Sequence, residues 1–479
     1  MADKALPDKQ RGETLGKAEM LGLAAMAVGV FIVANDFTAL SVAIPAIEKD
    51  FGIDLTTAQW VINGYAMVFG VLIVTGGRLA DMFGRRRIFF IGALVFAVAS
   101  TLGGFAPNVW VLLAARFVMG IGGAMMWPAI LGMTYGLLPD GKKGLAGGTI
   151  MGAAGFGNAV GPLIGGTLTD TLSWRGIFFL NLPIAVFGIF VTWRVVAADR
   201  VGAGERKIDY GGIAVLSAGL IALLLALDEG TDIGWLDVRI IGLFVVAALA
   251  LVGFALVEHR AGEHALVPRD VLDNREFAAA ALATLLMSAL FFAALLYLPQ
   301  FMMKRLDYSA IEAGAGLLPM MGVFAVTSFI AGPLYNRLGP KIVVTAGAAA
   351  LAAGMFLLSR IAETSPFTEL IPGMAVLGVG VGLFYSSITT AGISALDKSR
   401  SSLAGAIIYM AQIAGGSIGL GLNTAIVVSN PVLADGISIA FFVDGCLAIG
   451  GLLVVLFFVG GRIDGERLEE MVHYHRAHG

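Results

Sequence analysis

The chain has 479 residues, of which 58% are hydrophobic and only 14% are charged. A soluble globular protein carries about 25% charged and about 45–50% apolar residues, so a single water-soluble core cannot bury this much apolar surface. The net charge of -3 offers no basic field for nucleic acid, and the single cysteine excludes an intrachain disulfide and a cysteine-ligated metal centre.

Long apolar runs recur along the chain, and a bilayer-spanning helix needs about 20 such residues. We therefore predict an all-α integral membrane protein with fourteen transmembrane helices. They are expected near residues 20–44, 57–77, 87–106, 109–137, 144–168, 174–196, 209–229, 238–258, 277–303, 309–334, 341–361, 368–394, 403–428 and 438–460.

The distribution of basic residues predicts the orientation of the helices. If the N-terminus is cytoplasmic, most lysines and arginines fall in cytoplasmic segments, as the positive-inside rule requires. Both termini are then cytoplasmic. The basic residues that carry this prediction are Arg85, Arg86, Arg87, Lys142, Lys143, Arg206, Lys207, Arg269, Arg275, Lys398 and Arg400.

The chain also repeats itself. A Gly-Arg-Leu-Ala-Asp-Met-Phe-Gly-Arg-Arg-Arg segment at 77–87 follows the second predicted helix, and a related segment at 332–341 follows the second helix of the last six. Such repeats are typical of transporters built from two six-helix halves. We predict tails at 1–18 and 463–479, six-helix bundles at 19–200 and 263–462, and a linker with an inserted transmembrane hairpin at 201–262.

The 77–87 segment is a candidate conformational latch. Gly77 and Gly84 flank Asp81, and Arg85 and Arg86 follow. A carboxylate here can cap a neighbouring helix N-terminus or pair with arginine, in a contact that forms in one state and breaks in the other. The alternative is that the arginines only fix the topology.

Small residues crowd the fifth predicted helix at Gly157, Gly161, Pro162, Gly165 and Gly166. Glycines four apart let two helix backbones touch, and proline weakens the local hydrogen-bond ladder. The segment can thus bend or seal against a partner as the halves move. Ordinary small-residue packing is the alternative.

Two charges lie within predicted membrane helices of the first half. Asp36 lies in the outer part of the first helix, and Arg116 lies at a similar depth in the fourth. A charge at the bilayer centre costs at least about 2.5–3.5 kcal/mol on insertion scales, so such residues pair, face water or change protonation. A pair between Asp36 and Arg116 is geometrically plausible, and a change of partner can load or release a proton at Asp36. A fixed hydrogen bond of Asp36 and packing of Arg116 against carbonyls are the alternatives.

Other side chains can line a substrate cavity. Asp444, in the last helix, can attract a cationic substrate or carry a second proton, or it can sit at a wet helix entrance. Aromatic faces attract organic cations, and a few amides would orient them, although packing or lipid-facing roles are the alternative for each residue. The further candidates are Trp60, Asn63, Trp127, Tyr297, Gln300, Tyr409 and Gln412.

These motifs resemble those of the major facilitator superfamily. The 77–87 segment is similar to motif A, and 157–166 to motif C, the antiporter motif. Arg116 resembles the arginine of motif B, which implies a part in proton transfer. Asp36, with Thr38 and Pro45, resembles the first-helix motif of the fourteen-helix drug:proton antiporter-2 family. The chain departs from motif A at Met82, and the second copy carries Asn336 in place of aspartate.

The resemblance implies a proton-coupled antiporter that exports lipophilic, cationic drugs across the bacterial cytoplasmic membrane by alternating access. It implies a monomer that contacts membrane lipids and protons, uses the proton gradient and needs no cofactor. An exporter of an endogenous lipid, siderophore or metabolite, a nutrient importer and a non-transporting receptor or scaffold are the alternatives. An enzyme is not expected, because the sequence has no nucleotide loop, metal cluster or nucleophile constellation.

Overall fold

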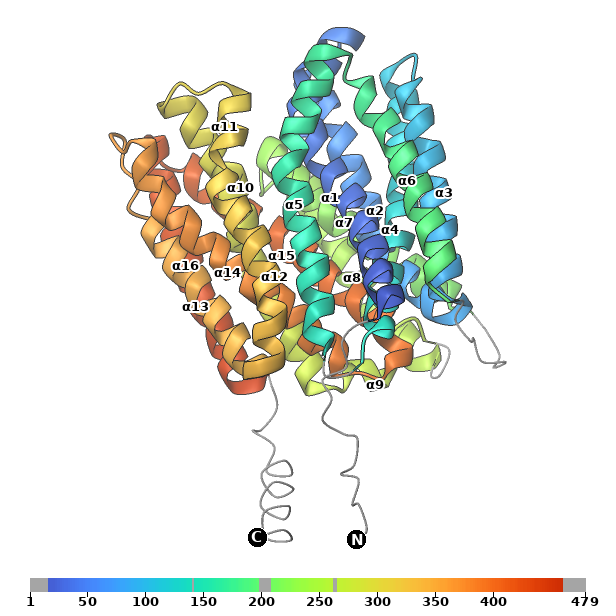
Figure 1. Ribbon diagram of the computed structural model, residues 1–479. Helices are drawn as coiled ribbons and strands as arrows, with labels where there is room; N and C mark the ends of the chain where they lie inside the picture. The colour runs from blue at the N-terminus through green and yellow to red at the C-terminus, as the bar shows by residue number, and fades with distance from the viewer. Residues whose placement is uncertain (1–15, 140–141, 198–207, 262–264, 460–479) are drawn as a thin grey trace, which may run out of the picture.

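The computed structural model describes residues 16–139, 142–197, 208–261 and 265–459, and every regular element in these ranges is a helix. Residues 1–15 and 463–479 of the predicted tails, together with Arg206 and Lys207, lie outside the described residues. Figure 1 shows two groups of helices side by side, α1–α6 in blue to green and α10–α16 in yellow to red. The end at which α1 begins and α16 ends, at the bottom of the view, is called the lower end below.

The first group contains six long helices that alternate in direction, so that α2 ends and α3 begins at the lower end. Asp54 caps α2 by accepting a hydrogen bond from the Thr57 amide, and Asn108 caps α4 by accepting one from the Val111 amide. The helices are α1 (Lys17–Phe51), α2 (Leu55–Phe83), α3 (Arg85–Gly104), α4 (Val109–Leu137), α5 (Lys143–Thr171) and α6 (Arg175–Val195).

The second group repeats this arrangement. Gly339 separates two helices at φ 82°, as Gly84 separates α2 from α3 at φ 102°, and both are conformations that glycine adopts without strain. The equivalent turns support the predicted repeat. The helices are α9 (Arg269–Leu272), α10 (Arg275–Arg305), α11 (Ala310–Gly316), α12 (Leu318–Leu338), α13 (Pro340–Leu358), α14 (Phe367–Ser394), α15 (Ser401–Val428) and α16 (Leu433–Phe458), with a 3-10 turn at Lys398–Arg400.

Between the two groups lies the hairpin of α7 (Tyr210–Ile233) and α8 (Val238–Ala261). Helix α7 packs against both α2 and α15, whereas α8 packs against α7. Near the centre, Leu224 of α7 lies close to the point at which Gly70 of α2 meets Ile413 of α15. At the end of α7, the Trp235 ring packs over Gly230 and Gly421. The predicted insertion therefore covers the line along which the two halves meet.

Thirteen of the described helices are long and apolar enough to cross a membrane. Helix α5 is not among them, because its many glycines lower its hydropathy, yet it packs along α1 and α12 within the bundle. With α5, the helices that run through the bundle number fourteen, as predicted. The prediction of one helix over 309–334 is wrong in detail: a Ser309–Glu312 capping box starts the short α11, and α12 starts separately with a proline in its first turn.

Candidate functional site

The two charges predicted in the first half form an ion pair. Arg116 Nη1 of α4 lies 2.5 Å from Asp36 Oδ2 of α1, and both side chains are 0% exposed. The pair that the predicted depths made plausible is thus present in the structure. A buried pair of this kind is stable only while both members are present, since loss of one strands the other charge in an apolar setting.

A second polar group, the Asn181 amide, also contacts the carboxylate. Asn181 Nδ2 of α6 donates to Asp36 Oδ1 at 3.0 Å, and it also lies 3.1 Å from Ser100 Oγ of α3. Asp36 is therefore held by groups from α4 and α6. Asn181 was not predicted as a site residue; its position as an amide within an apolar membrane helix was the signal in the sequence.

Arg116 is held by a carbonyl and by aromatic rings. Its Nε donates to the Val61 carbonyl at 2.5 Å, and its guanidinium carbon lies 4.4 Å from the centroid of the Tyr65 ring. Its Nη2 atom has no hydrogen-bond partner. The Val61 carbonyl and the Tyr65 ring would therefore still contact Arg116 if Asp36 were protonated. An ion pair that breaks and forms again requires such remaining partners.

An aromatic cluster lies beside this pair and spans both halves of the molecule. Trp127 of α4 and Tyr409 of α15 lie with ring centroids 4.5 Å apart, and Phe69 of α2 lies 5.6 Å from Tyr409. Phe37, next to Asp36 in the chain, packs edge-on against Tyr65 at 4.8 Å. Trp127 and Tyr409, two of the predicted cavity residues, are thus brought together where the halves meet.

The remaining predicted cavity residues are more scattered. Trp60, Asn63 and Gln412 are half-buried, and half-buried Gln300 accepts a hydrogen bond from Lys304 Nζ. Tyr297 is buried, and its hydroxyl lies 2.6 Å from Thr424 Oγ1. Tyr297 and Gln300 thus form hydrogen bonds with residues outside the aromatic cluster.

Asp444 is fully buried in α16. It accepts a hydrogen bond from Asn423 Nδ2 of α15 at 3.1 Å, and its other carboxylate oxygen has no partner. Asp444 does not face solvent in this conformation. It therefore does not lie at a wet helix entrance, which was one of the alternatives that the sequence left open.

The predicted latch joins the two halves at the lower end. Asp81 of α2 accepts hydrogen bonds from the amides of Ser402 at 3.3 Å and Leu403 at 2.9 Å, in the first turn of α15. Arg85 Nε donates to Asp81 Oδ1 at 3.1 Å and also contacts the Lys398 carbonyl. A carboxylate at a helix N-terminus is stabilised by the unpaired amides and the helix dipole, so Asp81 ties α2 to the opposite half.

The other residues of this segment support the contact. A Cβ at Gly77 would lie 2.8 Å from the Ser402 carbonyl oxygen, so glycine allows α2 and α15 to approach. Gly84 makes the turn into α3, and Arg86 donates to the Trp193 carbonyl at 2.9 Å.

The second copy makes the corresponding contact with an amide. Asn336 Oδ1 at the end of α12 accepts a hydrogen bond from the Gly144 amide, in the first turn of α5, at 3.0 Å. Tyr135 of α4 and Thr390 of α14 add a hydroxyl contact of 2.9 Å between the halves. The lower end is thus closed by related but chemically different contacts.

The glycines of α5 bring its backbone against α1. A Cβ at Gly165 would lie 2.1 Å from the Ala39 carbonyl oxygen, and one at Gly161 would lie 2.0 Å from Thr38 Oγ1. Gly157 approaches the Phe31 carbonyl oxygen in the same way, at 3.1 Å, whereas Gly166 has more room, with its nearest neighbour at 3.7 Å. These glycines and Pro162 lie in the half of α5 away from the lower end.

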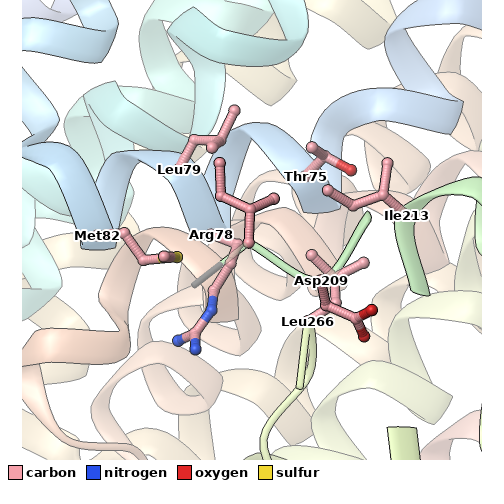
Figure 2. Close-up of a pocket in the computed structure, with 8 residues that line it drawn as sticks. Thr75, Arg78, Leu79, Met82, Asp209, Ile213 and Leu266 are labelled. Carbon is pink, nitrogen blue, oxygen red and sulfur yellow. The ribbon is translucent and has the colours of Figure 1, made fainter. Parts of the chain in front are cut away.

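Figure 2 shows a hollow between α2 and the start of α7, in which the Arg78 guanidinium points away from the Asp209 carboxylate. Its volume of about 10 Å³ holds about one water molecule, which excludes it as a drug site. A larger groove of about 430 Å³ between α3 and α4 is lined by apolar side chains alone, several of them on the exposed surface. Neither hollow contains the predicted site residues.

The comparisons with known proteins decide the family. The model of the Major Facilitator Superfamily matches residues 26–420 and 280–470. The chain is a member of the major facilitator superfamily. Its fold is also similar to that of the human organic anion transporter MFSD10 (TETRAN), with a TM-score of 0.65 over 91% of this chain and 99% of that one, at 13% identity.

Bacterial relatives within the superfamily are similar over most of their length. The chain is 34% identical to the puromycin resistance protein of Streptomyces alboniger, over 92% of this chain and 88% of the relative. It is 31% identical to the tetracenomycin C resistance and export protein of Streptomyces glaucescens, over 83% and 74%, respectively. It is 30% identical to the multidrug resistance protein Stp of Mycobacterium tuberculosis, over 85% and 75%. The chain is therefore a multi-pass membrane protein of a transporter superfamily.

Proposed function

We propose that this protein exports lipophilic, cationic drugs across the bacterial cytoplasmic membrane in exchange for protons. The observation that carries the proposal is the fully buried ion pair of Asp36 and Arg116. A carboxylate at membrane depth that can exchange an internal cation for a proton is the element that proton coupling needs. The relatives named for drug resistance and export support the choice of cargo.

The aromatic cluster supports a cationic, lipophilic cargo. Trp127, Tyr409 and Phe69 offer ring faces from both halves of the molecule, and cations are attracted to such faces. A site shared between the halves changes shape when they move, so that affinity differs between the two states. This difference is what alternating access requires of a substrate site.

The lower end is assigned to the cytoplasm, because it carries Arg85, Arg86 and Arg87 in the first turn of α3. The contacts of Asp81 and Asn336 close this end in the conformation described. Protonation of Asp36 from outside would weaken its attraction to Arg116 and favour outward release of the drug. Rocking of the halves, with rupture of the two contacts, would then open the inner side. We propose that the transporter works as a monomer in contact with lipid and needs no cofactor.

The test uses purified protein in liposomes that contain a pH-sensitive dye, with an imposed proton gradient and a panel of lipophilic cations. Wild-type protein should show cation-triggered proton flux, and the Asp36→Asn variant should show none. The matched control is Asp50→Asn: Asp50 lies on the same helix and pairs with Arg175 at 2.6 Å, but at a solvent-accessible position where its side chain is 42% exposed.

Retained coupling in Asp36→Asn would contradict the assignment of the proton site. Absence of flux with every cation, in wild-type protein shown to be folded, would exclude this cargo class and favour an endogenous lipid or metabolite.

A further inference from the structure

The second half of the molecule contains a buried acid that the mechanism above does not use. Asp444 is 0% exposed within α16, which is long and apolar enough to cross the membrane. Helices α10, α13 and α15 pack around α16. The carboxyl group is therefore enclosed by protein on several sides.

The hydrogen bonds around Asp444 leave two buried oxygen atoms without a donor. Asn423 Nδ2 donates to Asp444 Oδ1 at 3.1 Å and lies 2.8 Å from the Gly419 carbonyl. Asp444 Oδ2 and Asn423 Oδ1 have no partner, and both are buried. Asp444 and Asn423 are thus hydrogen-bonded to each other, yet each has one acceptor oxygen that lacks a donor.

The neighbouring helices supply no compensating cation. From α10, Tyr297 is the titratable group that faces Asp444, and its hydroxyl bonds with Thr424. From α13, the Phe356 ring packs against Gly445, and α15 contributes Asn423. Among the described residues, Asp444 forms no ion pair with a lysine or arginine, and its hydrogen bond comes from the Asn423 amide.

Asp36 shows what an ionised carboxylate needs at this depth. It has the guanidinium of Arg116 on one oxygen and the amide of Asn181 on the other. An ionised Asp444 would have a single N–H group, and an isolated charge in an apolar setting is strongly unfavourable. A proton on Oδ2 removes the charge and turns one of the two unpartnered oxygens into a donor.

We propose that Asp444, held by Asn423, is a second proton-binding site of the transporter. The site rests on the proposed proton-coupled function. It is neutral in the conformation described, and it loses its proton when movement of the second half exposes it to water: the O–H bond breaks, the proton passes to water and a carboxylate remains. Asn423 acts as the positioning residue.

The first test needs no substrate. Infrared spectra of the full-length protein at neutral pH should contain the C=O stretch of a protonated carboxyl group, and Asp444→Asn should remove it. Asp435→Asn is the matched control, because Asp435 lies exposed in the first turn of the same helix and should leave the band unchanged. Asn423→Ala should keep the band but shift its frequency, since the hydrogen bond to the carboxyl is lost.

The second test measures protons moved per exported cation in liposomes. Asp444→Asn should lower this ratio by about one proton, because a group that no longer binds a proton cannot carry it. If wild-type protein exports none of the cations, the proposed function fails, and the infrared result still reports whether Asp444 is protonated.

Two results would overturn the proposal. A carboxyl band that survives in Asp444→Asn, with no shift in Asn423→Ala, would show that Asp444 is ionised. An unchanged ratio in a variant that has lost the band would show that the proton is permanent and takes no part in transport.

Discussion

Arg116→Met should destabilise the protein strongly, because it removes the cation that pairs with Asp36. Both partners are 0% exposed, so water cannot take the place of the guanidinium. Removal of one partner from a buried ion pair costs about 3–5 kcal/mol, whereas replacement of both is often neutral. The double variant with Asp36→Asn should therefore recover most of the loss. Asn181 can still hydrogen-bond the amide at position 36.

The measurement is the half-time of irreversible unfolding of the purified protein in detergent at one fixed temperature, for wild type, both single variants and the double variant. Half-times are suitable because large membrane proteins seldom unfold reversibly. The double variant should survive longer than Arg116→Met alone. If the losses of the two single variants simply add in the double, the two charges are stabilised independently, and the reasoning from a mutually dependent pair is refuted.

Three more predictions follow from the contacts between helices. Asp81→Ala should remove about 1.5–3 kcal/mol from the closed lower end, as expected for hydrogen bonds to a charged group, and spin-label distances between the halves should lengthen; an unchanged distribution would contradict the latch. Gly165→Ala should lower transport and stability because its Cβ would meet the Ala39 carbonyl oxygen at 2.1 Å, whereas Gly166→Ala should be tolerated at 3.7 Å, and equal effects in the two variants would contradict the close approach. Trp127→Ala should weaken binding of lipophilic cations by about 0.5–2 kcal/mol in a fluorescence titration, and unaltered affinity would remove the aromatic cluster from the substrate site.

Much of this arrangement was predictable because the bilayer constrains it. A charge at membrane depth needs a partner, and Asp36 and Arg116 lie at similar predicted depths, so the sequence made their pairing plausible. The turn glycines, Gly84 and Gly339, were likewise visible in the repeated segment. The start of α11 has a sequence signal in the Ser309–Glu312 capping box, and the start of α12 has one in Pro319, but the apolar run that contains both indicates a single helix.

Other features depend on packing between distant segments and could not be predicted. The sequence indicated that Asp81 could cap a helix, but not that the helix would be α15, more than 300 residues away. The contacts of Asn181 depend on how α1, α3 and α6 pack together, which the sequence alone does not indicate. The packing of α7 against α2 and α15 likewise joins segments that are far apart in the chain.

The two halves share a fold but not a charge distribution, and this difference bears on mechanism. At the lower end, a carboxylate in one half and an amide in the other cap opposite helices, so only the Asp81 contact can respond to protonation. Within the membrane, Asp36 has a cation to exchange for its proton, whereas Asp444 has an amide. Arg116 can therefore stabilise the Asp36 carboxylate while it stays buried, whereas the Asp444 carboxylate is stabilised only on exposure to water, which also accepts its proton. If both residues act in transport, proton release in the first half follows the position of Arg116, and proton release in the second half follows the opening of the bundle itself.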